Sequence, residues 1–352
     1  MALTCKVSVS MFPQDRRHCA QILCTLQWYE VKRYMGTLAF PSSLVGQSPL
    51  AVLAYSSLPK GNTMRIVLSR KGFDSSSGGC PSPILPDGRL RSLPIPELEG
   101  FSGAKYSQIY SGDAFPTGAI VEALTKGKVR ANSLTHFDPD IDRDAVLGRH
   151  PDWLGVFGQS GRVQGHLKKQ KIEVGDLFLF FGLARQTEGD AKTLQFVKDS
   201  PPIHTLWGWL QIGDIVKISK DTARKYPQFK DHPHVAYPER TKENTIYIGK
   251  KKLEIGGITK KLPGYGTFPI FDPRLQLTVE GKDTSVWCLP QWFERKLSWN
   301  PRDAQWSPCK KDQSKVVLHS THRGQEFVID LGSDAAVALE WLQGIFDCAQ
   351  ES

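Results

Sequence analysis

The chain has 352 residues, of which 40% are hydrophobic and 23% are charged; these proportions are ordinary for globular proteins and exclude a disordered or fibrous chain. Its net charge of +9 favours a phosphate-bearing partner such as a nucleotide or a nucleic acid. Residues 1–63 hold six basic and two acidic side chains, so the rest of the chain has only a mild basic excess, which argues against a protein that coats DNA by charge alone.

The first 63 residues show no sustained strand or helix periodicity, and they end in the turn-like sequence PKGN at residues 59–62. The pattern changes at Met64, where residues 64–69 read as the first core strand. We therefore expect one domain over residues 64–352. We interpret residues 1–63 as an upstream extension from a misplaced start, and an N-terminal regulatory tail is the alternative.

Several elements are predicted after that first strand. Residues 72–79 are glycine and serine rich and predict a polar loop. Residues 82–85 and 89–93 flank Pro86-Asp87-Gly88, which predicts a tight turn between two strands. Residues 117–128 are expected to be helical.

Two apolar segments predict the centre of the fold. Residues 174–181 and 204–216 are buried strands by pattern, and a polar loop of about 20 residues joins them. Short strands are expected at 275–278 and 325–329, and residues 220–273 are expected to form an irregular or hairpin-bearing surface. The class is therefore α+β, with a mixed or barrel-like β centre and with flanking helices.

A helix is expected to close the chain. It is predicted to be capped near Ser333 or Asp334, and its apolar residues recur on one face that should pack on the sheet. These residues are Ala335, Ala338, Leu339, Leu342, Ile345 and Phe346.

Cysteines and hydropathy bear on the compartment. Seven scattered cysteines without a CxxC pair indicate neither a disulfide framework nor structural zinc. No apolar run reaches the roughly 18 residues needed to cross a bilayer, and the N-terminus lacks the pattern of a signal peptide. We expect a cytoplasmic protein without a membrane partner.

The loop at residues 72–79 is a candidate phosphate site. It directly follows a strand, so the backbone at Gly78 and Gly79 and the hydroxyl of Ser75 are suited to phosphate oxygens. Arg70 and Lys71 would supply positive charge. The alternative is a flexible connector.

A second candidate comprises Asp74 and three residues of the segment 136–140. His136, Asp138 and Asp140 lie at i, i+2 and i+4 of an extended segment that Pro139 keeps from being helical. Such side chains can hold a cation or act as acids and bases, although acidic runs are also common in solvated turns. We expect this segment and the 72–79 loop to share one pocket.

Three further polar residues are candidates for contacts to a nucleotide. The amides of Gln159 and Gln325 are able to read the edge of a base, and His166 is a possible acid or base. A histidine beside a leucine is more often a packed structural residue.

The order of several blocks resembles the third family of nucleotide modification associated domains. The blocks are IVLSRKGFDS at 66–75, residues 136–140, FGQ at 157–159, GDLFLFFG at 175–182, WGWLQIG at 207–213, LSW at 297–299 and GQEFV at 324–328. The resemblance implies a prokaryotic-type protein that takes part in modifying nucleotides or nucleic-acid bases, without a defined reaction or cofactor. A shorter similarity, over the two central strands, is to PUA-like barrels that grip flipped or modified bases.

Two functions from different classes therefore compete. The first is an enzyme, or enzyme subunit, that modifies a nucleotide or a base of DNA or RNA, in which titratable groups converge in one pocket. The second is a non-catalytic reader of a modified or flipped base, which needs an aromatic slot. A metal-dependent nuclease is a third possibility, but the sequence lacks a recognisable nuclease pattern of acidic and lysine residues.

Overall fold

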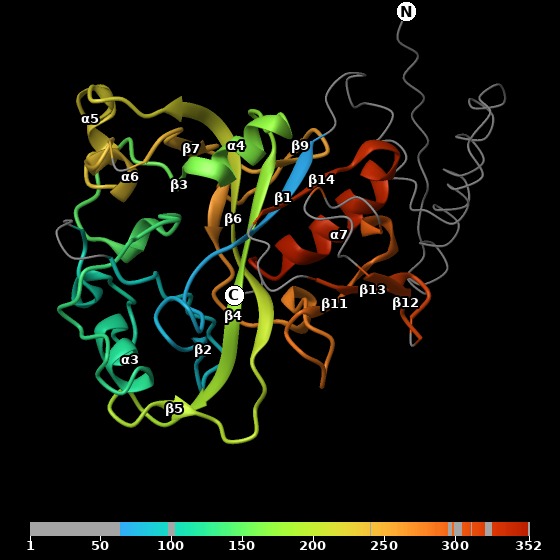
Figure 1. Ribbon diagram of the computed structural model, residues 1–352, viewed down its shortest axis with the longest axis horizontal. Coiled ribbons are helices and arrows are strands. Elements are labelled where there is room, and N and C mark those ends of the chain that lie inside the picture. The colour runs from blue at the N-terminus through green and yellow to red at the C-terminus, as the bar shows by residue number, and fades with distance from the viewer. Residues whose placement is uncertain are drawn as a thin grey trace, which may run out of the picture. The chain divides into compact units, whose positions relative to one another are not determined.

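The computed structural model describes residues 64–97, 103–239, 241–294, 298, 305–310, 312–320 and 326–350 (Figure 1). The chain divides into two compact units, Met1–Ser48 and Pro49–Ser352, and every described residue belongs to the second. The expectation for residues 1–63 lies outside the described part. Among the described residues, no helix is long and apolar enough to cross a membrane.

A mixed β-sheet forms the centre of the second unit, with its main path in the order β14-β1-β4-β6-β7-β3. The strands on this path are β1 (Arg65–Arg70), β3 (Val156–Gln159), β4 (Leu177–Glu188), β6 (Ile203–Lys217), β7 (Thr245–Gly249) and β14 (Glu326–Asp330). Three short strands extend the sheet: β2 (Ser82–Ile84) and β5 (Gln195–Phe196) pair with β4, and β10 (Tyr265–Thr267) pairs with β6. Within the described residues β14 and β3 do not pair with each other, so the sheet is open and the expected barrel does not close.

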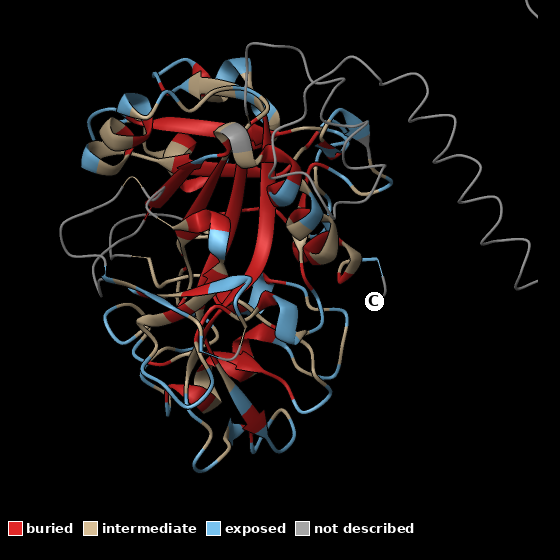
Figure 2. Cartoon of the chain, turned by 90° about the vertical axis from the view of Figure 1, so that its right-hand side faces the viewer, coloured by how far each residue is buried: buried red, intermediate tan, exposed pale blue. Residues whose placement is uncertain are grey.

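The central strands read as continuous apolar runs because both faces of the sheet are covered. Ile66, Leu68 and Leu179 belong to one hydrophobic cluster. Val67 and Phe178 belong to another, on the opposite side of the same strands. Figure 2 shows the strands as a buried layer.

The first of these clusters is covered by elements from the C-terminal part of the chain. They are a small sheet of β11 (Val286–Pro290), β13 (Lys315–His319) and β12 (Gln305–Pro308), and the helix α7 (Ala335–Asp347). The predicted apolar face of α7 is confirmed, since Leu342 and Phe346 are fully buried in that cluster. A separate hairpin joins β8 (Glu254–Ile255) and β9 (Ile258–Thr259).

Among the described residues, three helices contribute to the second cluster: α4 (Gly161–Lys169), α5 (Thr222–Lys225) and α6 (Pro233–Ala236). The helix α3 (Thr117–Leu124) packs instead in a third cluster, with Phe73 and Tyr106. The helix expected at 117–128 therefore ends earlier, at Leu124. The predicted turn at residues 86–88 is confirmed, because the N–H of Gly88 donates to the carbonyl of Leu85 at 2.9 Å. The strand expected after it, at 89–93, is not observed: only isolated bridges form there, at Arg89 and Leu90.

Two predictions about the second half of the chain were wrong. The strand expected at 275–278 is replaced by the 3-10 helix Pro273–Leu275, followed by isolated bridges at Gln276 and Thr278. The region 220–273, expected to be an irregular or hairpin-bearing surface, does contain the β8–β9 hairpin, but it also contains β7, whose residues are all buried. The lysines on both sides of β7 make this part of the sequence polar, so the short buried strand was not predicted.

Candidate functional site

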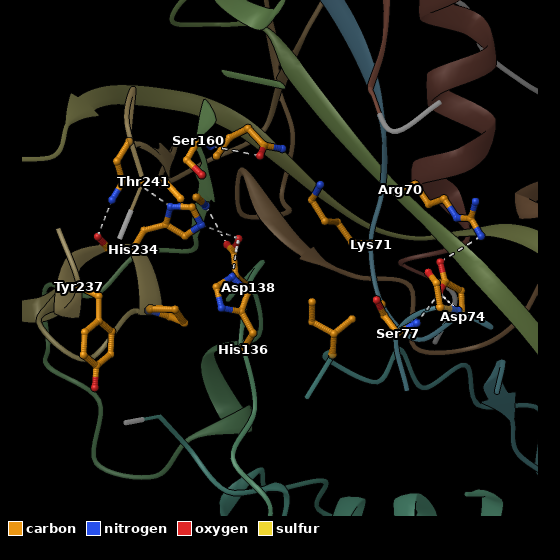
Figure 3. A pocket seen from close by; sticks show the side chains of 17 residues that line it. Arg70, Lys71, Asp74, Ser77, His136, Asp138, Ser160, His234, Tyr237 and Thr241 are labelled. Atoms are coloured by element: carbon orange, nitrogen blue, oxygen red, sulfur yellow. Dashed lines mark hydrogen bonds and ion pairs between the residues drawn. The ribbon is translucent and has the colours of Figure 1, made fainter. Parts of the chain in front are cut away.

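A polar cavity of about 660 Å³ lies beside the end of β1 (Figure 3). Its walls come from the loop after β1, from the segment containing His136 and Asp138, from the end of β3, and from the stretch between α6 and Asn244. The 72–79 loop and the 136–138 segment thus line one cavity, although about 60 residues separate them in the sequence.

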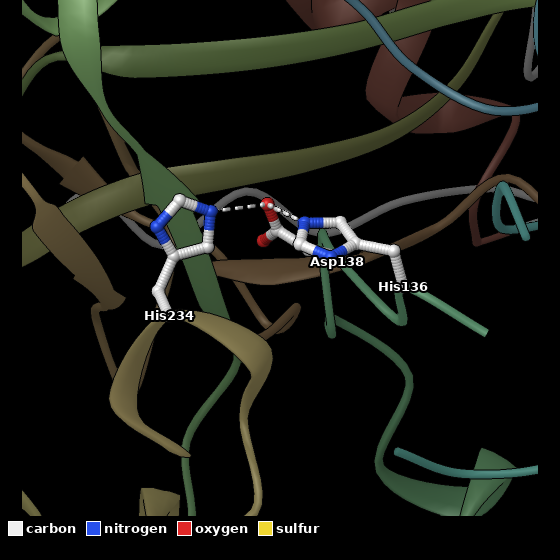
Figure 4. Close-up of side chains that lie close together, drawn as sticks. All are labelled: His136, Asp138 and His234. Carbon is white, nitrogen blue, oxygen red and sulfur yellow. Dashed lines mark ion pairs between the residues drawn. The ribbon is translucent and has the colours of Figure 1, made fainter. Parts of the chain in front are cut away.

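Asp138 is the centre of one wall, where it is surrounded by imidazoles (Figure 4). Its Oδ2 atom lies 3.5 Å from Nε2 of His234 and 3.9 Å from Nε2 of His136. Its Oδ1 atom accepts the backbone N–H of Gly158 at 2.7 Å and lies 3.2 Å from Nε2 of His232. One carboxylate oxygen is therefore anchored to β3, and the other faces two histidines.

The second nitrogen of each facing histidine is held from behind. Nδ1 of His136 lies 2.8 Å from Oε2 of Glu97, and Nδ1 of His234 lies 2.6 Å from Oδ1 of Asn244. The Asn244 amide is oriented by its Nδ2 atom, which donates to the carbonyl of His234 at 3.0 Å. Both acceptors place the ring proton on Nδ1, so the lone pairs of neutral rings lie on Nε2 and face Asp138.

Burial and charge set the protonation of this cluster. Burial alone would raise the pKa of Asp138, but hydrogen bonding and charge from His232 and His234 outweigh it and lower that pKa. Burial lowers the pKa of His136. It also disfavours the charged form of His234, yet the Asp138 carboxylate reverses the balance and raises the pKa of His234. Asp138 is therefore an anion at neutral pH.

The opposite wall carries the positive charge. Nζ of Lys71 lies 2.9 Å from Oε1 of the fully buried Glu326 and 5.0 Å from the ring centre of Phe157. The same Glu326 oxygen accepts from Ser69 and Gln159. Lys71 is thereby fixed with its ammonium group at the cavity, as Figure 3 shows.

Asp74 organises the loop that follows Lys71. Its Oδ1 atom accepts the N–H and hydroxyl of Ser76 and the N–H of Ser77, at 2.7–2.8 Å, and its Oδ2 atom lies 3.1 Å from Nη2 of Arg70. Because these loop donors serve Asp74, they are engaged within the protein. The ammonium group of Lys71 has three N–H donors and gives one of them to Glu326, so Lys71 is the stronger candidate for an anionic ligand.

The family model described as nucleotide modification associated domain 3 matches residues 65–330. The chain belongs to this family. Neither a curated protein nor a solved structure matches this chain. The match contains the whole described lining of the cavity, whereas α7 begins beyond it. Membership therefore bears directly on this cavity.

Six of the residues singled out in the sequence line the cavity: Arg70, Lys71, Asp74, His136, Asp138 and Gln159. Ser75, Gly78 and Gly79 do not. Gly79 donates its N–H to the carbonyl of Asp74 and closes the loop on itself. A Cβ atom at Gly78 would collide with the ring of Phe73 at 2.4 Å, so this glycine serves packing at a positive φ of 89°.

Asp140 and His166 also lie away from the cavity lining. The expected convergence of Asp140 with His136 and Asp138 is not observed, because Arg149 forms a two-point ion pair with Asp140 at 2.5 and 2.7 Å. His166 is on α4, where Nε2 lies 3.1 Å from the hydroxyl of Ser298. Gln325 is outside the described residues.

Sequence reasoning missed the residues that complete the cluster. His232 and His234 come from the segment at α6, Asn244 precedes β7, and Glu97 follows the proline-rich stretch at 94–96. The signal available was the spacing of two histidines around Pro233. It lay in a region interpreted as irregular surface.

Proposed function

We propose that this cavity binds a nucleotide, or a base of DNA or RNA, and modifies it chemically. One observation carries the proposal: a fixed lysine and a cluster of ionisable groups face each other across one cavity of about 660 Å³. That volume is in the range of small-ligand sites, which is roughly 300–1,000 Å³. Membership in a family of nucleotide modification associated domains supports the choice of ligand.

The two walls have different tasks in this proposal. Lys71 and Arg70 attract the phosphate, since an ammonium or guanidinium group forms strong charge-assisted hydrogen bonds with phosphate oxygens. Gln159 lies beside them and is able to donate to or accept from a base. The groups around Asp138 receive the part of the ligand that reacts, because ionisable side chains with shifted pKa values are typical of catalytic sites.

The alternative is a reader of a modified base on a PUA-like centre. A reader holds an extruded base mainly by stacking it on aromatic rings. Apart from histidines, the aromatic ring among the described lining residues is that of Tyr237. The polar and ionisable lining supports an enzyme over a reader.

The proposal is tested by ligand binding to the wild type and to the double variant Lys71→Met/Glu326→Gln. The double substitution removes both members of the ion pair, so it leaves no unpaired carboxylate in the core. We expect the wild type to bind a nucleoside phosphate, and the double variant to bind it about 10–100-fold more weakly, as loss of a charged hydrogen bond implies.

The parent nucleoside serves as the matched ligand in calorimetric titrations, and its affinity should change little in the double variant. If the double variant loses affinity equally for the nucleoside and the nucleotide, Lys71 does not contact the phosphate and has only a structural role. A wild type that binds no nucleotide, DNA or RNA would contradict the proposal.

A further inference from the structure

We propose that Nε2 of His136, Nε2 of His234 and Oδ2 of Asp138 together bind a divalent transition-metal ion. The inference deepens the proposed function and rests on it only for the substrate, because metal binding is measured without any nucleotide. Its basis is the convergence of three ligand atoms within 4.8 Å of one another, from two segments about 95 residues apart in the chain.

The spacing fits a shared ion better than direct hydrogen bonds. Hydrogen bonds from imidazole N–H groups to a carboxylate are about 2.7–3.2 Å long, whereas the two nitrogens lie 3.5 and 3.9 Å from Oδ2. Ligands about 2.0–2.2 Å from a metal lie roughly 3.0–3.6 Å from each other in tetrahedral or octahedral arrangements. The two oxygen–nitrogen separations require a contraction of a few tenths of an ångström. The two nitrogens lie within 4.8 Å of each other, so their separation would shorten by at most about 1.2 Å.

The orientation of the rings supports the same conclusion. Glu97 and Asn244 engage Nδ1 of His136 and His234, so the nitrogen of each ring that is left to face the Asp138 carboxylate is Nε2. A metal ion bound there would take the place of the proton that otherwise lies between these atoms. Holding the outer ring nitrogen with a carboxylate or an amide oxygen is the usual support of a metal-binding histidine.

The two oxygens of Asp138 have different roles: Oδ1 holds the side chain in place, and Oδ2 is available to the ion. Oδ1 is used by the N–H of Gly158 and by His232, and these contacts hold the carboxylate in place without occupying Oδ2. A purely structural role in the core would be complete with Oδ1 alone. His136, Asp138 and His234 all line the cavity.

The donor atoms define the class of ion. Two imidazoles and one carboxylate suit Fe²⁺, Zn²⁺, Co²⁺ or Mn²⁺, whereas Mg²⁺ and Ca²⁺ prefer oxygen ligands. Three protein ligands leave coordination positions open towards the cavity. A nucleotide anchored at Lys71 would have its reacting atom at those positions, where a metal acts as a Lewis acid or orients the substrate.

The experiment uses the untagged full chain, stripped of metal with a chelator and titrated with Co²⁺ by calorimetry and visible absorption. We expect one equivalent of Co²⁺ to bind with the spectrum of nitrogen and oxygen ligands. Asp138→Asn and His234→Gln should weaken binding by 100-fold or more. Asn244→Ala removes only the support of His234 and should weaken it about 10–100-fold.

Matched controls are His150→Ala and Asp152→Asn, a histidine and an aspartate of an exposed pair elsewhere on the surface; both should bind Co²⁺ like the wild type. Undiminished binding by Asp138→Asn and His234→Gln, or less than one tenth of an equivalent bound by the wild type, overturns the proposal. X-ray absorption of the wild-type complex needs no variant. It should show two imidazoles, and a shell dominated by sulfur or made of oxygen alone also overturns the proposal.

These outcomes are separate from the fate of the proposed function. If the protein binds one equivalent of metal but no nucleotide, the metal site is upheld and the proposed nucleotide function is contradicted. If the metal-free protein binds and modifies a nucleotide, the proposed function is upheld and the metal site is contradicted.

Discussion

Asp138 and Asp140 are two buried carboxylates, two residues apart, with opposite surroundings. Asp140 meets the guanidinium of Arg149, which also lies over the ring of Trp153 at 3.9 Å from its centre. Asp138 meets three histidines and faces a cavity. The carboxylate of Asp140 is paired with a permanent cation, so its role is to stabilise the fold. The carboxylate of Asp138 is surrounded by titratable nitrogens, so it is able to exchange a proton or bind an ion.

The two aspartates also contribute differently to the protein. The Asp140 pair joins the 136–145 segment to the loop before β3, and its loss should be seen in stability. The Asp138 cluster is built on the N–H of Gly158 and leaves Oδ2 facing His136 and His234. Its loss should be seen in function.

The largest effect is expected from Asp138→Asn. The amide still accepts the N–H of Gly158 but loses the charge that faces His136 and His234. Modification of the nucleotide or base should therefore slow by roughly 100-fold or more, the usual scale for losing a positioned acid, base or ligand. Mass spectrometry of digested DNA and RNA measures the products, and an unchanged profile with a folded variant would remove Asp138 from the chemistry.

Asp140→Asn should behave in the opposite way. It leaves Arg149, whose side chain is only 9% exposed, without its counter-ion, and we expect the free energy of unfolding to fall by about 3 kcal/mol. Urea unfolding measures this loss, and the double variant Asp140→Asn/Arg149→Gln should recover part of it because no charge remains unpaired. If the variant is as stable as the wild type but inactive, Asp140 takes part in the reaction and not in stability.

A smaller effect is expected when His234 is displaced without being replaced. A Cβ atom at Gly158 would lie 2.2 Å from Cδ2 of His234, so Gly158→Ala must push the ring out of line with Asp138. We expect metal affinity and turnover to fall about 10-fold or more, since small misplacements of reacting groups are costly. Gly165→Ala is the control, because nothing lies within 4 Å of its added Cβ, and it should have no such effect.

The smallest effect at neutral pH concerns a buried histidine outside the cavity lining. Burial and the charge of Arg70 lower the pKa of His204 to about 4 from an ordinary 6.5, and its Nδ1 atom accepts from the indole of Trp287. The unfolded chain binds a proton here that the folded chain does not. Stability from this residue is therefore present above pH 6.5 and is lost as the pH falls to about 4, by about 3 kcal/mol.

The measurement for His204 is urea unfolding between pH 4 and 7 on the wild type and on His204→Gln, whose side chain is still able to accept from Trp287. The difference between the two should shrink as the pH falls. A constant difference would show that His204 does not titrate in this range.

The sequence predicted the elements whose pattern follows from burial alone. Strands β1, β4 and β6 are apolar runs because both sheet faces are covered, and α7 shows helical spacing because one face is buried. Strand β7 is five residues long in a lysine-rich region, so its pattern was too short to stand out.

The site was predicted only where its residues are close together in sequence. The spacing of His136 and Asp138 was informative, but the same spacing included Asp140, because a sequence does not show that Arg149 neutralises it. His234 and Asn244 reach the cavity through the tertiary fold, by way of α6 and the start of β7. Those contacts have no local pattern.

The most direct test of the account is anomalous X-ray diffraction from crystals of the wild type grown with Co²⁺ or Zn²⁺, collected on both sides of the absorption edge. We expect one anomalous peak between Nε2 of His136, Nε2 of His234 and Oδ2 of Asp138, at about 2.0–2.2 Å from each. Full metal occupancy at another site, with these three side chains joined by direct hydrogen bonds, would contradict it.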